Sequence, residues 1–116
     1  MANKPWLKQK DEKVIEVEGC KLTVQRISFG DSRKAIHQAF KFNPVTKDSE
    51  VDPTLLGVLR AIYQIKDWDL TDENDNKLPI TLDTFDNLLD EDFVGKVIDA
   101  VSKAFPQGVP EDKKKN

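Results

Sequence analysis

The chain has 116 residues, a length that fits one domain with its own core. Charged residues make up 34% of it and the formal net charge is -3, whereas an average globular domain has roughly 25% charged residues. The single cysteine, Cys20, excludes an internal disulfide framework. No window approaches the roughly 18 apolar residues of a membrane span, and the polar N-terminus lacks the apolar segment of a secretory signal. These features predict a soluble, cytosolic protein.

The two signs of charge are unevenly distributed along the chain. Residues 1–47 carry ten Lys and Arg against five Asp and Glu, whereas residues 48–116 carry eight against sixteen. A basic half is typical of a nucleic-acid-binding protein when its charges gather on one helix face. Here they are spread over a predicted strand pair, a helix and the N-terminus. The distribution therefore favours solvation and weak self-complementarity over nucleic-acid binding.

Two β patterns begin the ordered part of the chain, after a segment at 1–13 that we expect to be flexible. The first covers 14–18 (VIEVE) and the second covers 21–27 (KLTVQRI), where apolar and polar residues alternate. Gly19-Cys20 separates them, so the pattern predicts a β-hairpin. Because an isolated hairpin is marginally stable in water, it must pack on other elements.

Two helix patterns come next. The first is capped by Asp31 or Ser32 and ends near Pro44, because the residue before a proline is pushed out of the helical region. A polar loop is expected over 44–52, and the second helix begins at the cap-and-proline pair Asp52-Pro53. The apolar stripe of the first helix consists of Ala35, Ile36, Ala39 and Phe40. The stripe of the second helix consists of Leu55, Leu56, Leu59, Ile62 and Tyr63, and Val58 and Ile65 widen it.

Two further helices are predicted in the second half of the chain. A short one begins near Thr81 or Asp83, and the last follows Asp90-Glu91-Asp92 and stops at Pro106. Their apolar residues are Phe85, Leu88 and Leu89 in the short helix, and Phe93, Val97, Val101 and Phe105, with Val94 and Ile98 beside them, in the last. The sequence therefore predicts one globular domain over 14–105 with an α+β fold, mostly α, in which the N-terminal β-hairpin packs on three to four short helices. Residues 106–116 have the composition of a disordered tail.

The acidic loop between the second and third helices has some of the spacing of a calcium site. A loop that starts at Asp72 places Asp or Asn at positions one, three and five. Position six, however, is Lys77, where the EF-hand needs glycine, and position twelve is Asp83 instead of the longer Glu. The residues favour a solvated turn, and we expect no metal or cofactor.

A catalytic constellation is also not apparent. His37 is the single histidine and lies in the first helix, while Cys20 lies at a strand turn. Neither has a neighbour in sequence that would complete a nucleophile-and-base pair. We therefore predict that the protein is not an enzyme.

Trp68 lies between two aspartates just after the second helix, with Leu70 two residues later. Large aromatic side chains mostly serve burial, so Trp68 is interpreted first as a lid over the core. Because tryptophan is enriched at binding hot spots, an exposed anchor for a partner protein is the alternative. Trp68, Leu70 and Val94 of the last helix are the candidate partner-binding residues.

Several of these segments together resemble the tail assembly chaperones of long-tailed bacteriophages. That family commonly shows a strand pair, here VIEVEGCKLTVQRISF, and a helix like LLGVLRAIYQI that leads into Trp68-Asp69-Leu70. A polar turn, a Leu78-Pro79 segment and a final amphipathic helix extend the likeness over about 14–105. The turn over 73–77 lacks the glycine usual in the family, although asparagine can adopt the left-handed conformation that a turn needs.

The resemblance implies a non-enzymatic chaperone and scaffold in the bacterial host cytoplasm. It implies binding to the tape measure protein and help in recruiting tail tube subunits. Many members also have a frameshifted longer product, for which the lysine run at 113–115 is a candidate site, with a solubilising basic tail as the alternative. Apolar patches on short helices are compatible with a homo-oligomer.

The alternative function is a small nucleic-acid-binding regulator. It would use the first two helices as a helix-turn-helix. In that motif roughly three or four residues separate the two helices, whereas the loop over 43–52 is longer.

Overall fold

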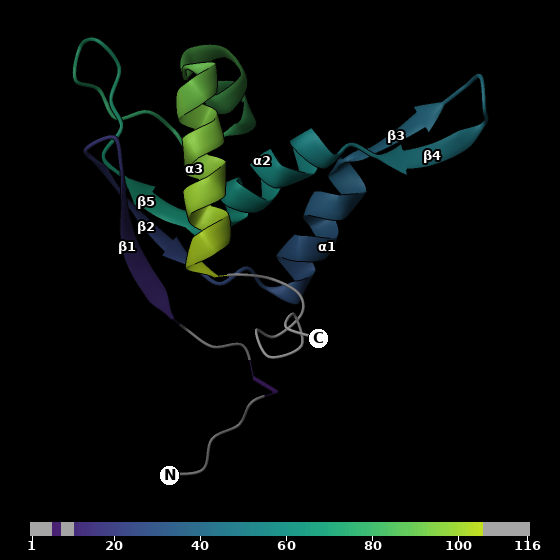
Figure 1. Ribbon diagram of the computed structural model, residues 1–116, viewed down its shortest axis with the longest axis horizontal. Helices are drawn as coiled ribbons and strands as arrows, with labels where there is room; N and C mark the ends of the chain where they lie inside the picture. Colours follow the sequence, from purple (N-terminus) through teal and green to yellow (C-terminus); the bar gives the residue numbers. More distant parts are fainter. Residues whose placement is uncertain (1–5, 8–10, 106–116) are drawn as a thin grey trace, which may run out of the picture.

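The computed structural model describes residues 6–7 and 11–105. Within them, four helices and two small antiparallel sheets form an α+β fold, and this confirms the predicted class. In Figure 1 the larger sheet lies behind the last helix, while the smaller sheet projects from the opposite side of the molecule. Most of the flexible segment predicted at 1–13 lies outside the described residues. The disordered tail predicted at 106–116 lies wholly outside them.

The predicted N-terminal hairpin is present. β1 (Glu12–Val17) pairs antiparallel with β2 (Cys20–Gln25). Glu18 and Gly19 form the connecting turn with positive φ angles of 52° and 82°. Two positive φ angles are the geometry of a type I′ turn, whose twist matches that of the flanking strands.

A third strand, β5 (Ile65–Trp68), pairs with β2 and gives the sheet the order β1-β2-β5. The prediction that Ile65 extends the second helix is therefore wrong. α2 (Pro53–Gln64) ends one residue earlier, and Ile65 is buried as a strand residue. The apolar stripe of α2 does include that position, but pairing with a distant strand outweighs the local helical pattern.

α1 (Phe29–Gln38) begins earlier than predicted. Its N-cap is Ser28, whose Oγ accepts a hydrogen bond from the Asp31 N–H at 3.0 Å. The predicted caps Asp31 and Ser32 thus lie inside the first turn. Phe29 and Gly30 have low helix propensity, so the local pattern favours the polar residues that follow them as caps.

A second hairpin replaces the predicted helix end and polar loop. β3 (Phe40–Asn43) pairs with β4 (Asp48–Val51), so Phe40 is a strand residue and does not belong to the stripe of α1. The register places Phe40 opposite Val51, so these two residues share a face with Phe42, and all three are exposed. Figure 1 shows this hairpin projecting from the body of the protein beyond α1 and α2.

The second helix begins at the predicted cap-and-proline pair, and the last helix begins at Glu91, within the predicted acidic segment rather than after it. Asp52 caps α2 by accepting from the N–H groups of Thr54 and Leu55 at 3.1 and 3.3 Å. Asp90 caps α3 (Glu91–Ala104) by accepting from the N–H groups of Asp92 and Phe93 at 3.0 and 3.3 Å. Each carboxylate therefore satisfies N–H groups that have no partner inside the helix.

The short third helix is a single turn of π-helix, η1 (Thr84–Leu88). It buries Phe85 as predicted, and Leu89 packs against the core. Leu88, predicted to be buried, is exposed. A π turn is wider than an α turn, and in this single turn Leu88 lies on the outer side.

Two clusters of buried side chains hold these elements together. The smaller cluster joins α1 to α2 through Ala35, Ala39 and Leu59. The larger joins the three-stranded sheet to α2, α3 and η1, and its buried members are Val17, Leu22, Val24, Val58, Ala61, Ile65, Trp68, Leu70, Phe85, Val97, Val101, Ala104 and Phe105. None of the helices in the described ranges is long and apolar enough to cross a membrane.

Candidate functional site

Two of the three predicted contact residues lie in the core. Trp68 is 3% exposed and Leu70 is 5% exposed. The Trp68 Nε1 donates a hydrogen bond to the Leu78 carbonyl at 2.8 Å, and its ring lies 5.6 Å from that of Phe85, centroid to centroid. Trp68 thus closes the acidic loop over the core, as the lid interpretation expects. Partner binding by Trp68 or Leu70 stays a prediction, and in this conformation their side chains present almost no surface.

Val94, the third predicted residue, lines a surface hollow of about 570 Å³ between the first halves of α2 and α3. Val58 and Ile98 provide further apolar lining. The charged residues around the hollow are Glu91, Asp92, Lys96 and Asp99, and Lys96 is already paired with Glu18. The hollow therefore combines an apolar floor with an acidic rim.

A second hollow, of about 120 Å³, continues along the same two helices. It shares Ile98 with the first and is lined mainly by small and apolar residues, among them Gly57, Ala61 and Val101. Gly57 marks a close approach of the helices, because a Cβ added there would lie 3.6 Å from Ile98 Cγ2. We refer to these two hollows together as the α2/α3 groove.

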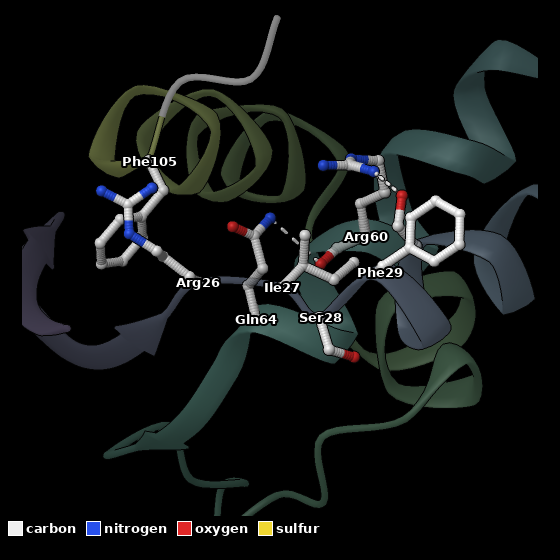
Figure 2. A pocket seen from close by; sticks show the side chains of 8 residues that line it. Arg26, Ile27, Ser28, Phe29, Arg60, Gln64 and Phe105 are labelled. Atoms are coloured by element: carbon white, nitrogen blue, oxygen red, sulfur yellow. Dashed lines mark hydrogen bonds between the residues drawn. The ribbon is translucent and has the colours of Figure 1, made fainter. Parts of the chain in front are cut away.

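A third hollow, of about 290 Å³, adjoins the end of this groove and shares Arg60, Gln64 and Phe105 with it. Figure 2 shows Arg26 and Arg60 on opposite sides of it, with Gln64 and Ile27 between them. We call it the arginine pocket. The groove and the pocket together thus pass from an acidic end near Val94 to a basic end.

The acidic loop is held by its own hydrogen bonds. Asp72 Oδ1 accepts from the N–H groups of Asn76 and Asn74 at 2.9 and 2.8 Å. These bonds hold the pKa of the Asp72 carboxyl below its usual range, because they stabilise its charged form. The left-handed residue of the turn is Asp75, with φ 63°, and not an asparagine. Within residues 6–7 and 11–105, no group of three His, Cys, Asp or Glu side chains is placed to hold a metal ion.

Cys20 and His37 have separate surroundings. Burial, and then the negative charges of Asp69, Glu16 and Glu18, raise the pKa of the Cys20 thiol. A raised pKa keeps the thiol protonated, whereas a nucleophilic cysteine needs a lowered one. His37 is exposed on α1 beside Arg33 and Lys34.

Comparison with known proteins gives no match, neither to a family model nor to a curated protein sequence or a solved structure. Among the surfaces described above, the sequence predicts Val94 but neither the α2/α3 groove nor the arginine pocket. Arg26 and Arg60 belong to separate segments, and no spacing pattern links them.

Proposed function

We propose that this protein is a non-enzymatic chaperone and scaffold in bacteriophage tail assembly. It binds helical, apolar segments of the tape measure protein and helps to recruit tail tube subunits. The observation that carries the proposal is the α2/α3 groove, with its apolar floor and with Val94 in its lining. The client is suggested by the likeness of the strand pair, Trp68-Asp69-Leu70 and Leu78-Pro79 to that chaperone family.

The groove has the properties that helix recognition requires. An amphipathic helix binds a groove of this kind through apolar side chains three and four positions apart. Val58, Val94 and Ile98 would contact such a stripe, and the acidic rim would attract basic residues beside it. A contact of this size per copy is suited to weak, repeated binding along a long client and to fast release as tube subunits arrive.

The alternative, a nucleic-acid-binding regulator, has less support from the fold. The β3–β4 hairpin separates α1 from α2, so these helices do not form the short-turn pair of a helix-turn-helix. The acidic rim of the groove would also repel a phosphate backbone.

The test is a pulldown of the tagged protein from cells that produce the whole tail gene cluster, with the recovered proteins identified by mass spectrometry. We expect wild type to recover the tape measure protein and the tail tube protein, and Val94→Asp to lose the tape measure protein. Val14→Asp is the matched control, because Val14 is 67% exposed on β1 and does not line the groove.

The two parts of the proposal fail in different ways. Recovery of nucleic acid, or of neither protein, by wild type would refute the function in tail assembly. Equal recovery of the tape measure protein by wild type and Val94→Asp would refute binding in the groove and place the client on another surface.

A further inference from the structure

The charged residues that line the arginine pocket are basic. The protein as a whole is acidic, with a net charge of -3. Within the described part of the chain, no acidic residue lines this pocket, whereas Arg26 and Arg60 both do. Phe105, Ile27 and Phe29 provide apolar surface around the two guanidinium groups.

Arg60 is a recessed cation whose only side-chain hydrogen bond in the described ranges is to a neutral group. Its Nη1 donates to Ser32 Oγ at 2.7 Å, and among these residues no carboxylate forms an ion pair with it. Burial lowers the pKa of the guanidinium, although an arginine stays charged. A partly buried charge without a counter-charge is unfavourable, so a bound anion would relieve a cost that is present in the free protein.

Arg26 shows how a carboxylate binds at the other side of the pocket. Its Nε donates to Asp11 Oδ2 at 3.1 Å, and its guanidinium lies 5.2 Å from the centroid of the Phe105 ring. Lys13 Nζ lies 4.9 Å from the same centroid, so a second cation adds to the positive potential here. The terminal nitrogens of Arg26 make no hydrogen bond to the described residues and are free to donate to a ligand.

Gln64 lies between the two arginines and supplies an amide group. Its side chain is buried, at 4% exposure of the residue, and its Nε2 donates to the Arg60 carbonyl at 3.3 Å. Its Oε1 makes no hydrogen bond within the described residues, and Figure 2 shows it on the side of Arg26. An amide with a free acceptor matches the N–H group of a polypeptide backbone.

From this arrangement we propose that the arginine pocket binds an extended acidic segment of a partner protein. One carboxylate binds Arg60, a second binds Arg26, and a backbone N–H between them donates to Gln64 Oε1. Two cations on opposite sides of the pocket, with an amide acceptor between them, match a ligand that has two carboxylates and a backbone N–H. An extended acidic chain provides this combination, because its alternate side chains point the same way. The arginine pocket adjoins the site of the proposed function, since Arg60 and Gln64 also line the second hollow of the α2/α3 groove. Arg26 lines the pocket and neither hollow of the groove, so Arg26→Gln tests this inference separately from Val94→Asp.

The test is fluorescence anisotropy with the full chain and a labelled ten-residue peptide of alternating glutamate and threonine. We expect binding that weakens with added salt, and no binding of the matched peptide with glutamine for glutamate. Arg60→Gln and Arg26→Gln should each weaken binding about tenfold, the order expected for the loss of a charge-assisted hydrogen-bonded pair. Arg33→Gln is the matched control, because Arg33 is exposed on α1 outside the pocket.

Unchanged affinity in both pocket variants would overturn the proposal. A thymidine oligonucleotide of equal charge is tested against the same variants. If it binds more tightly than the peptide and loses affinity in both pocket variants, the occupant is nucleic acid and the proposal is overturned. Circular dichroism checks that each variant is folded, since Arg60 also links α2 to Ser32 of α1. Arg26→Gln, at an exposed side chain, carries the test alone if Arg60→Gln unfolds.

Discussion

Replacing Trp68 by alanine tests whether this residue is a structural element of the core. Trp68 is the last residue of β5 and is 3% exposed, and its ring packs against Phe85 of η1. Its removal deletes the ring contact with Phe85 and the hydrogen bond to the Leu78 carbonyl at 2.8 Å. Losing a buried tryptophan leaves a cavity and lowers the free energy of unfolding by about 3–5 kcal/mol.

A second variant separates the hydrogen bond from the packing. Trp68→Phe keeps an aromatic ring next to Phe85 but has no donor for the Leu78 carbonyl. We expect it to lower the free energy of unfolding by about 1–3 kcal/mol, because a partly buried carbonyl loses its partner. The two variants should therefore fall in a fixed order, with alanine the more destabilising.

The assay is urea unfolding followed by far-UV circular dichroism, which does not depend on tryptophan fluorescence. Trp6→Ala is the matched control, because Trp6 is 75% exposed, and it should change stability by less than about 0.5 kcal/mol. A midpoint for Trp68→Ala equal to that of Trp6→Ala would refute the structural role, and loss of partner binding by the stable variant would then support the anchor.

Three further predictions concern helix ends and helix packing. Asp90→Ala removes the cap of α3 and should lower the free energy of unfolding by about 1 kcal/mol in urea, with Asp90→Asn less harmful because it keeps an acceptor. Gly57→Ala should raise the free energy of unfolding by about 0.5–1 kcal/mol, because alanine favours a helix more than glycine does. The new Cβ would lie 3.6 Å from Ile98 Cγ2, an ordinary van der Waals contact. A lower free energy of unfolding would mean that α2 and α3 must approach more closely. Hydrogen bonds from Lys41 and from the N–H of α2 hold the pKa of Asp52 below its usual range. The folded chain therefore binds this proton less readily than the unfolded chain, so the contribution of Asp52 is complete above its ordinary pKa and is lost as pH falls through the lowered value. In thermal melts between about pH 6 and about pH 3, Asp52→Asn should lose less stability on acidification than wild type does.

Local chemistry explains which parts of the fold could be predicted. Asp52 is predictable as a cap, and Asp90-Glu91-Asp92 as the start of a helix, because a helix N-terminus depends on a few adjacent residues. The first hairpin was identified because its alternation and its glycine turn are also local. Ile65, in contrast, fits the stripe of α2 as well as it fits a strand, and pairing with β2 decides between the two.

The candidate site could be predicted only in part for the same reason. Val94 is predicted as an exposed apolar position of the last helix. It is half-buried, packs against the core and borders the groove. The groove itself depends on how α2 and α3 cross near Gly57, which no helical period specifies. The arginine pocket depends on bringing Arg26 and Arg60 together, and that requires the whole tertiary fold.

The strand order β1-β2-β5 has a consequence for how the protein is made. The central strand β2, with buried Leu22 and Val24, is synthesised early. Its pairing partner β5, and the α3 residues Val97 and Val101 that share its core cluster, come from the second half of the chain. Lys13 Nζ donates a hydrogen bond to the Ala104 carbonyl at 2.6 Å, so β1 at the start of the domain is also held by the last residue of α3. Such long-range pairing cannot form during synthesis of the first half. We therefore expect the core to assemble only after α3 has emerged.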